Sequence, residues 1–217
     1  MKIDLPGFSE PIRPGKLICI GRNYAEHAKE MQSAIPTEPM IFLKPATSLV
    51  GSGGTIVIPT QSQEVHHEVE LVVALLKGGK NIPESDALHH IAGYAVGLDM
   101  TARDLQGRAK KVGAPWSVAK GFDTFAPIGD FVAANMVPDV QDLFISLKVN
   151  GEVRQKGHTA DMIFSVVTLV AYASTIFTLE PGDLIYTGTP EGVGAIQKED
   201  VLEAEITSLP TLYVTTE

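Results

Sequence analysis

Two glutamates, Glu68 and Glu70, stand at the start of an apolar, β-branched run that continues to Leu76. Such a run is typical of a buried strand. Side chains alternate faces along a strand, so both carboxylates point to the same side, with His66 beside them. Carboxylates at such a place repel each other and are costly to desolvate unless a cation or a proton lies between them. The alternative is a solvent-facing edge on which both glutamates are hydrated.

A third carboxylate, Asp99, belongs to a predicted strand over residues 94–101 that has one bulky and one small-residue face. Asp99 lies on the small face, which leaves room in front of it for a ligand or an ion. Together with Glu68 and Glu70 it favours a hard divalent cation, Mg²⁺ or Mn²⁺, over zinc. Three carboxylates and a dication leave a net charge of about −1, so an anionic substrate needs cationic side chains nearby. The candidates are Arg22, Arg103 and Lys120.

A second constellation is His27 and Glu30, which are three residues apart on a predicted helix and so share a face. A carboxylate can orient a histidine and raise its basicity, which gives a base suited to activating water near neutral pH. The alternative is an exposed helix face that carries a histidine by chance.

Other catalytic readings fit less well. A non-haem iron site of His66, His67 and Glu68 is disfavoured because adjacent strand residues face opposite ways. Paired glycosidase acids would flank a sugar, whereas residues two apart on a strand lie side by side, and aromatic platforms are few at 6%. The loop Gly188–Gly194 matches no phosphate-binding fingerprint, although Thr189 could offer a hydroxyl or backbone amide to a carboxylate.

The elements that must position these residues form a mixed pattern. Predicted strands cover residues 16–20, 40–43, 56–58, 69–76, 94–101, 143–149, 184–186, 201–206 and 211–216, and predicted helices cover residues 24–32, 84–91, 102–111 and 162–176. Asn23, Thr101 and Asp161 are the expected helix caps, and Asn150-Gly151 predicts a hairpin turn. Arg103 and Gln106 share one side of the third helix. Strands outnumber helices without a βαβ series, which indicates an α+β, β-rich class.

Composition narrows the function classes. The 217 residues suit one domain over 1–217, with residues 1–15 as an N-terminal extension. A net charge of −9 without a basic block argues against nucleic acid and anionic membranes as partners. No apolar run approaches the roughly 20 residues that span a bilayer. The acidic, proline-containing N-terminus is not a signal peptide, and the single Cys19 gives no disulfide framework, so we expect a cytoplasmic protein.

Six segments taken in order resemble the fumarylacetoacetate hydrolase family. They are Gly21-Arg22-Asn23-Tyr24, His67-Glu68-Val69-Glu70, Leu98-Asp99-Met100-Thr101-Ala102-Arg103-Asp104, Pro115-Trp116 with Lys120, Val149-Asn150-Gly151-Glu152 and Thr187-Gly188-Thr189-Pro190. They extend over nearly the whole chain, and the chain most resembles the short, single-domain branch of acylpyruvate hydrolases and oxaloacetate decarboxylases.

The resemblance implies a mixed β-sandwich roll with short peripheral helices, usually a homodimer. It implies Mg²⁺ or Mn²⁺ held by Glu68, Glu70 and Asp99, and a lid dyad of His27 and Glu30. Lys120 would lie beside the metal. The residues expected to approach the substrate are Arg22, Arg103, Gln106 and Thr189.

The expected activity is metal-dependent C–C hydrolysis of 3-acylpyruvates, of the acetylpyruvate or fumarylpyruvate type, or decarboxylation of oxaloacetate. Both pass through a pyruvate enolate that the metal stabilises, next to the fixed charge of Lys120. The alternatives are an oxaloacetate keto–enol tautomerase and a 2-hydroxyhepta-2,4-diene-1,7-dioate isomerase. A remoter alternative is a dicarboxylate-binding module without turnover, in which a water-activating dyad would be idle. The expected partner is a small 2-oxo acid.

Overall fold

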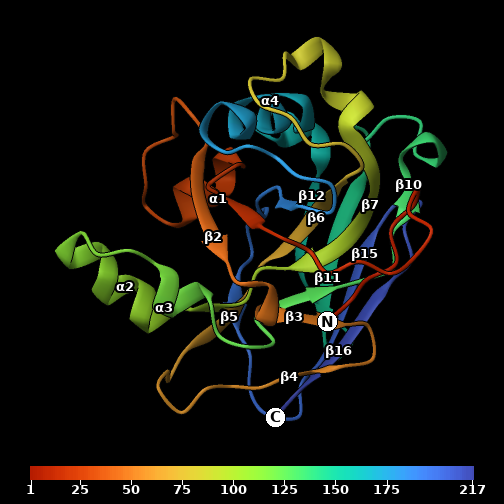
Figure 1. The fold of residues 1–217 in the computed structure, drawn as a ribbon. Coiled ribbons are helices and arrows are strands. Elements are labelled where there is room, and N and C mark those ends of the chain that lie inside the picture. The colour runs from red at the N-terminus through yellow and green to blue at the C-terminus, as the bar shows by residue number, and fades with distance from the viewer.

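Three β-sheets dominate the computed structural model, which describes residues 1–217 (Figure 1). The largest has, in spatial order, β2 (Met40–Lys44), β1 (Leu17–Gly21), β13 (Leu184–Tyr186), β6 (Val69–Leu75), β7 (Ile91–Leu98), β9 (Ala126–Ile128) and β3 (Leu49–Gly51), with β10 (Val132–Ala133) paired to β7. The second has β12 (Glu152–His158), β11 (Phe144–Val149), β15 (Val201–Ile206), β16 (Leu212–Thr216) and β4 (Thr55–Ile56). The third has β14 (Gly194–Ala195), β5 (Val65–His67) and β8 (Thr101–Ala102).

The helices lie around these sheets and are short (Figure 1). They are α1 (Ala25–Glu30), α2 (Arg103–Val112), α3 (Ser117–Lys120) and α4 (Val166–Ile176), and 3₁₀ turns cover Ala46–Ser48, Glu84–His90, Ala134–Met136 and Thr159–Asp161. The α+β, β-rich prediction is confirmed. No helix is long and apolar enough to cross a bilayer.

Strand β6 is buried along its whole length because both of its faces contact apolar layers. Leu71 and Val73 belong to the larger hydrophobic cluster, whereas Val72 and Ala74 belong to a second, smaller one. Glu68 and Glu70 have the same parity as Val72, so they lie at the end of the smaller layer. The carboxylates therefore lie beside tightly packed apolar residues and not on a solvated edge.

Strand β7 has the two unlike faces that its sequence predicts. Tyr94, Val96 and Leu98 join the larger cluster, and Ala95 joins the smaller one. On the small face, Gly97 stands opposite Glu70, and a Cβ there would lie 2.5 Å from Val72 and 2.8 Å from Tyr186. Close packing therefore continues up to the point where Asp99 follows the strand.

Two hairpins agree with their sequence signals. Asn150 and Gly151 have φ of 53° and 79°, and they connect β11 to β12 as predicted. The closing hairpin of β15 and β16 is also present.

Three predicted helix caps are wrong, and two of the three side chains have a different partner. The amide of Asn23 donates to the carbonyls of Phe164 (3.0 Å) and Thr187 (2.8 Å), so Tyr24 is the N-cap of α1, without a side-chain bond. The Thr101 hydroxyl donates to the Asp99 carbonyl at 3.2 Å and leaves α2 without a side-chain cap.

The third error concerns α4. The helix begins at Val166 and not at residue 162, and Ser165 caps it by accepting from the Thr168 N–H. Asp161 ends a 3₁₀ turn instead. The helix predicted over residues 84–91 is likewise a 3₁₀ turn.

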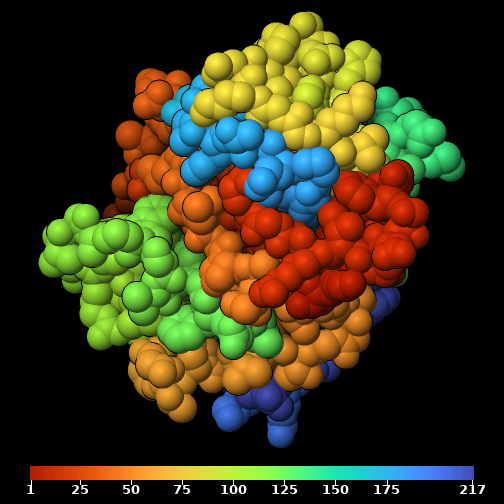
Figure 2. Space-filling view, viewed as in Figure 1, coloured from red at the N-terminus to blue at the C-terminus, as the bar shows by residue number.

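The N-terminal residues 1–15 lie across the large sheet. Ile3 and Leu5 are buried in the smaller cluster, and Ile3 pairs with Ile12 in an isolated bridge. Figure 2 shows this segment spread over the front surface of the molecule.

Candidate active site

The pairing of β6 with β7 brings the three predicted metal ligands together. Val69 stands opposite Leu98, and the Asp99 N–H donates to the Glu68 carbonyl at 2.8 Å, which fixes the two chain segments side by side. One carboxylate oxygen from each of Glu68, Glu70 and Asp99 lies within 4.8 Å of the others. All three side chains are buried. We call these three residues the carboxylate cluster.

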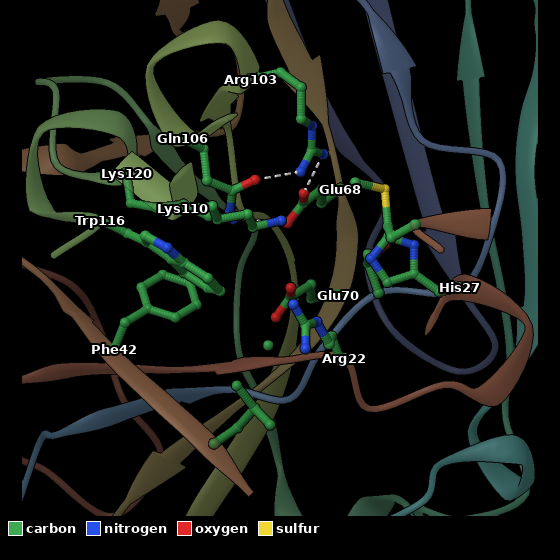
Figure 3. Close-up of a pocket in the computed structure, with 14 residues that line it drawn as sticks. Arg22, His27, Phe42, Glu68, Glu70, Arg103, Gln106, Lys110, Trp116 and Lys120 are labelled. Carbon is green, nitrogen blue, oxygen red and sulfur yellow. Dashed lines mark hydrogen bonds and ion pairs between the residues drawn. The ribbon is translucent and has the colours of Figure 1, made fainter. Parts of the chain in front are cut away.

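Three cationic side chains contact the carboxylate cluster. The Lys120 ammonium lies 2.8 Å from Glu68 Oε2 and 2.5 Å from Asp99 Oδ2. Arg103 Nη2 lies 2.5 Å from Glu68 Oε1 and is drawn with that bond in Figure 3. Lys44 Nζ lies 2.7 Å from Asp99 Oδ1. Glu68 and Asp99 therefore have a cation at each carboxylate oxygen.

Lys44 is a site residue that the sequence reasoning missed. Its ammonium is fully buried and also donates to the carbonyls of Met100 (2.9 Å) and Phe125 (2.6 Å). A signal was present, because Lys44 is a lone charge at the end of an apolar strand, on the same face as Phe42. The partner of such a charge is Asp99, which is distant in the chain, and no local pattern contains that contact.

The two glutamates differ in their electrostatics. Burial by itself would raise the pKa of Glu68, but the charges of Lys120 and Arg103 outweigh it and hold that pKa well below its usual range. Burial raises the pKa of Glu70 well above its usual range, and the negative charges of Asp99 and Glu68 raise it further. The Gly188 N–H, which donates to Glu70 Oε2 at 2.8 Å, opposes this only in part. Glu70 is thus the carboxylate with the least charge compensation.

The carboxylate cluster suits a hard divalent cation. Its donors are all carboxylate oxygens, which Mg²⁺ and Mn²⁺ prefer, and an oxygen that accepts from a lysine keeps a further lone pair for an ion. A dication would remove the repulsion that raises the pKa of Glu70. Glu68, Glu70 and Asp99 are therefore the residues that would hold it.

The structure places His27 and Glu30 in contact. His27 Nδ1 lies 3.1 Å from Glu30 Oε2, and Glu30 Oε1 accepts from the Gly192 N–H at 3.0 Å. An ionised carboxylate can only accept, so Nδ1 carries the proton and Nε2 of a neutral ring is free to accept one. His27 is buried at the pocket wall, whereas the Glu30 side chain is 33% exposed.

A single pocket gathers most of the predicted site residues (Figure 3). Its lining includes Arg22, His27, Glu68, Glu70, Arg103, Gln106, Lys120 and Thr189. Asp99 lies beneath it, against Lys120, and Glu30 lies behind His27. The pocket is open to the surface, and its cavity volume is about 30 Å³.

Gln106 and Thr189 have defined partners. Gln106 is buried and accepts from Arg103 Nη1 at 2.8 Å, as the shared helix face predicts. The Thr189 hydroxyl accepts from Gln155 Nε2 at 2.8 Å. Gln155 also donates to the Pro190 carbonyl, and its Oε1 accepts from the Val69 N–H at 3.0 Å. Gln155 therefore joins the loop that carries Thr189 to the strand that follows Glu68.

Sequence reasoning did not identify Gln155 or Lys110. Gln155 is buried on a strand of the second sheet, and no residue type or spacing marks its contact with the loop after β13. Lys110 lines the pocket, and it could have been found. It follows Arg103 by seven residues and Gln106 by four, so the three share one face of α2.

His66 and His67 contact other partners and do not face the carboxylate cluster as ligands. His66 Nε2 lies 2.8 Å from Glu64 Oε1, and His67 Nδ1 lies 2.9 Å from Gln155 Oε1. Burial lowers the pKa of each ring. Neither belongs to the group of residues that could hold a metal ion.

Comparison with known proteins finds similar chains. The chain is 54% identical over 194 residues to an Arabidopsis thaliana protein named "Oxaloacetate tautomerase FAHD1, mitochondrial", covering 89% of this chain and 87% of the relative. A crystal structure of fumarylpyruvate hydrolase from Pseudomonas aeruginosa, in complex with Mn²⁺ and pyruvate, superposes with a TM-score of 0.94 at 42% identity, covering 100% and 95% of the two chains.

A third relative has another activity in its name. The structure of 2-hydroxyhepta-2,4-diene-1,7-dioate isomerase from Mycobacterium marinum has a TM-score of 0.84 at 38% identity, and covers 95% of this chain and 75% of its own. The family model for the fumarylacetoacetate (FAA) hydrolase C-terminal domain matches residues 16–216. The chain therefore belongs to the fumarylacetoacetate hydrolase family, as its sequence motifs indicate.

Proposed function

We propose that this protein is a Mg²⁺- or Mn²⁺-dependent enzyme that hydrolyses the C–C bond of 3-acylpyruvates, of the acetylpyruvate or fumarylpyruvate type, or decarboxylates oxaloacetate. The observation that carries the proposal is the carboxylate cluster, which shares one pocket with a histidine oriented by Glu30. The relative with bound Mn²⁺ and pyruvate supports both the metal and the kind of product.

The bound cation would polarise the carbonyl of a 2-oxo acid and stabilise the negative charge that develops on its oxygen. Lys120 provides a second, fixed positive charge beside Glu68 and Asp99. This charge is in place before the reaction begins, so it stabilises the developing oxyanion without reorganisation. Burial would lower the pKa of Lys120, but Asp99 and Glu68 outweigh it and raise that pKa, which keeps the ammonium charged.

His27 is the candidate base for hydrolysis. With Nδ1 held by Glu30, its Nε2 would take a proton from a water molecule that attacks the distal carbonyl of the acylpyruvate. The C–C bond then breaks, the acyl group leaves as a carboxylic acid, and the pyruvate enolate takes up a proton. Oxaloacetate needs no water, because loss of carbon dioxide gives the same enolate.

A second candidate is keto–enol tautomerisation of oxaloacetate. The name of the Arabidopsis relative, at 54% identity, favours it specifically. His27 would then move a proton between the carbon next to the ketone and the ketone oxygen, and no C–C bond would break. The isomerase among the structural relatives represents a third reaction through a related enol.

Release of pyruvate separates these candidates. We expect the Mg²⁺-loaded protein to bleach the absorbance of acetylpyruvate or fumarylpyruvate and to release one pyruvate for each diketone consumed. Oxaloacetate decarboxylation also releases pyruvate, whereas a tautomerase changes the enol absorbance of oxaloacetate without releasing any. If none of the three compounds releases pyruvate, the proposal is refuted.

Metal dependence has its own test. Glu70→Gln should lower Mn²⁺ affinity by roughly a hundredfold or more and abolish turnover, because it removes one of three charged ligands. Glu64→Gln is the matched control, since Glu64 is half exposed and lies outside the carboxylate cluster. Calorimetric titration with Mn²⁺ measures the affinity. Unchanged Mn²⁺ affinity and activity in Glu70→Gln would disprove the metal assignment.

A further inference from the structure

Two of the cations that line the pocket have no carboxylate partner. Arg103 and Lys120 are engaged by Glu68 and Asp99. Arg22 and Lys110 line the same pocket, and neither makes an ion pair within the chain. Unpaired cations that face a common cavity are suited to an anion that arrives from solution.

Lys110 is held in place by an aromatic layer. Its ammonium lies 5.3 Å from the centroid of the Trp116 ring, a cation–π distance. Trp116 in turn packs on Phe42, with ring centroids 5.7 Å apart. In Figure 3 Lys110 lies on the same side of the pocket as Trp116, opposite His27. The Lys110 side chain is exposed at the pocket mouth, and its contact with Trp116 positions the charge at one wall.

Arg22 is fixed through its backbone. Its φ of 59° is in the left-handed region, which a side chain other than glycine rarely adopts. The next residue, Asn23, maintains this turn through its side chain. Its Nδ2 donates to the carbonyls of Phe164 and Thr187, and its Oδ1 accepts from the Phe164 N–H. Strained positions that the surrounding structure enforces cluster at ligand sites.

The charges at the bottom of the pocket are already matched. The carboxylate cluster supplies three negative charges, and Lys44, Lys120 and Arg103 supply three positive ones. A bound dication, Arg22 and Lys110 are then positive charges without counterparts. A ligand with a single carboxylate would leave much of this charge unmatched, whereas a ligand with two would match more of it.

We propose that Lys110, together with Arg22, binds a second carboxylate at the far end of the substrate, so that the site selects dianionic 2-oxo acids over monoanionic ones of equal length. The inference rests on the proposed function, because it takes the 2-oxo acid end to lie at the carboxylate cluster. Lys110 is then a specificity-determining residue that takes no part in bond breaking.

Two unreactive probes of equal length test this subsite. 2-Oxoglutarate and 2-oxopentanoate each have five carbons and differ only in whether the far end is a carboxylate or a methyl group. Neither is a β-dicarbonyl compound or a β-keto acid, so neither can undergo the proposed C–C cleavage. Calorimetric titration into the Mg²⁺-loaded protein should show tighter binding of 2-oxoglutarate.

The variants assign that preference to Lys110. Lys110→Met should weaken 2-oxoglutarate binding by about five- to tenfold, as expected for one charge-assisted contact at a partly hydrated site, with the loss confined to this ligand. Lys110→Arg should retain the preference. Lys111→Met is the matched control, since Lys111 is the next residue of the same helix and lies outside the pocket.

Failure of this inference differs from failure of the proposed function. Equal affinity for the two probes in the wild type, or equal loss of both in Lys110→Met, would overturn the subsite even if acylpyruvates are hydrolysed. A Lys110-dependent preference for 2-oxoglutarate in a protein that turns over no acylpyruvate or oxaloacetate would support the subsite and refute the enzyme.

Discussion

The carboxylate cluster and the His27–Glu30 dyad face the same pocket but are held by different kinds of structure. The cluster lies at the ends of two paired strands, is buried, and has cations at its oxygens. The dyad lies on the six-residue helix α1, and Glu30 is partly exposed and tied to the main chain through the Gly192 N–H. Helices this short depend on tertiary contacts for their stability.

This difference separates two tasks within one site. Holding a metal requires oxygens that do not move, which the sheet provides. Orienting a base requires a hydrogen bond to its ring, which Glu30 on α1 provides. Changes in the cluster should therefore affect folding and metal binding together, whereas changes in the dyad should affect chemistry alone.

Among the changes that separate the two regions, the largest expected effect is on chemistry at the dyad. His27→Ala should lower kcat for acylpyruvate hydrolysis by about a hundred- to ten-thousandfold, the range for a lost general base, and leave Mn²⁺ affinity unchanged. Decarboxylation of oxaloacetate should fall less, because it needs no water. Steady-state kinetics and calorimetry measure the two quantities. His89→Ala is the control, since His89 is exposed, and a parallel loss of Mn²⁺ affinity in His27→Ala would contradict the separation.

Next in size is the effect of removing Lys44. Lys44→Met leaves Asp99 without one of its buried counterions and two carbonyls without their donor. Breaking such a pair costs about 3–5 kcal/mol of unfolding free energy, which urea denaturation of the metal-free protein would measure. Lys148→Met removes a partly exposed lysine that pairs with Glu203 and Glu205, and should cost about 1 kcal/mol or less. An equal loss of unfolding free energy in the two variants would show that the buried ion pair contributes no more to stability than the partly exposed one.

The sequence predicted these two regions to different degrees. Period-two alternation put Glu68 and Glu70 on one face and Asp99 on a small-residue face, because the pattern depends only on local strand geometry. That Asp99 meets the glutamates depends on the register of β6 with β7. Recognition of the family motifs supplied this contact; periodicity alone could not.

The misjudged helix ends have two causes. Asn23 and Thr101 have the residue types of N-caps, but Asn23 binds a group that the tertiary structure brings close, whereas Thr101 binds the carbonyl of Asp99, two residues before it. Asn23 reaches Thr187, which is 164 residues away. A capping preference of about 1 kcal/mol is small enough for such a contact to replace it. Lys44 and Gln155 were missed for the same reason, since their partners are distant in the chain.

Gln155 joins the strand that follows Glu68 to the loop of Thr189 and Pro190. The same loop binds Glu30 through the Gly192 N–H, so removing the Gln155 amide sharpens the comparison. Gln155→Met leaves the Val69 N–H without its acceptor and frees Thr189 and Pro190. An unsatisfied buried donor costs about 1–3 kcal/mol, so both regions should respond: stability should fall by that amount, and KM for an acylpyruvate should rise by roughly tenfold as Thr189 loses its orientation. Gln63→Met is the control, since Gln63 is exposed. Loss of stability at unchanged KM would assign Gln155 to the fold alone.

The smallest expected effect is a pH dependence at the mouth. Desolvation at the pocket mouth lowers the pKa of Lys110 to about 8. The charges of Arg103, Arg22 and Lys120 add to this, and Glu68 opposes it. Lys110 is cationic below that pKa and neutral above it. The preference for 2-oxoglutarate over 2-oxopentanoate should therefore be constant at lower pH and decline as the pH rises through about 8.

The same two probes do not change their own charge over the pH range of this measurement. Their carboxylates ionise at low pH, near the values of other carboxyl groups, so only the protein titrates between about pH 6 and 9.5. Lys110→Arg should keep the preference over this range because an arginine stays charged, and Lys111→Met should decline as the wild type does. If the preference for 2-oxoglutarate declined at the same pH in Lys110→Arg as in the wild type, a group other than Lys110 would cause the pH dependence.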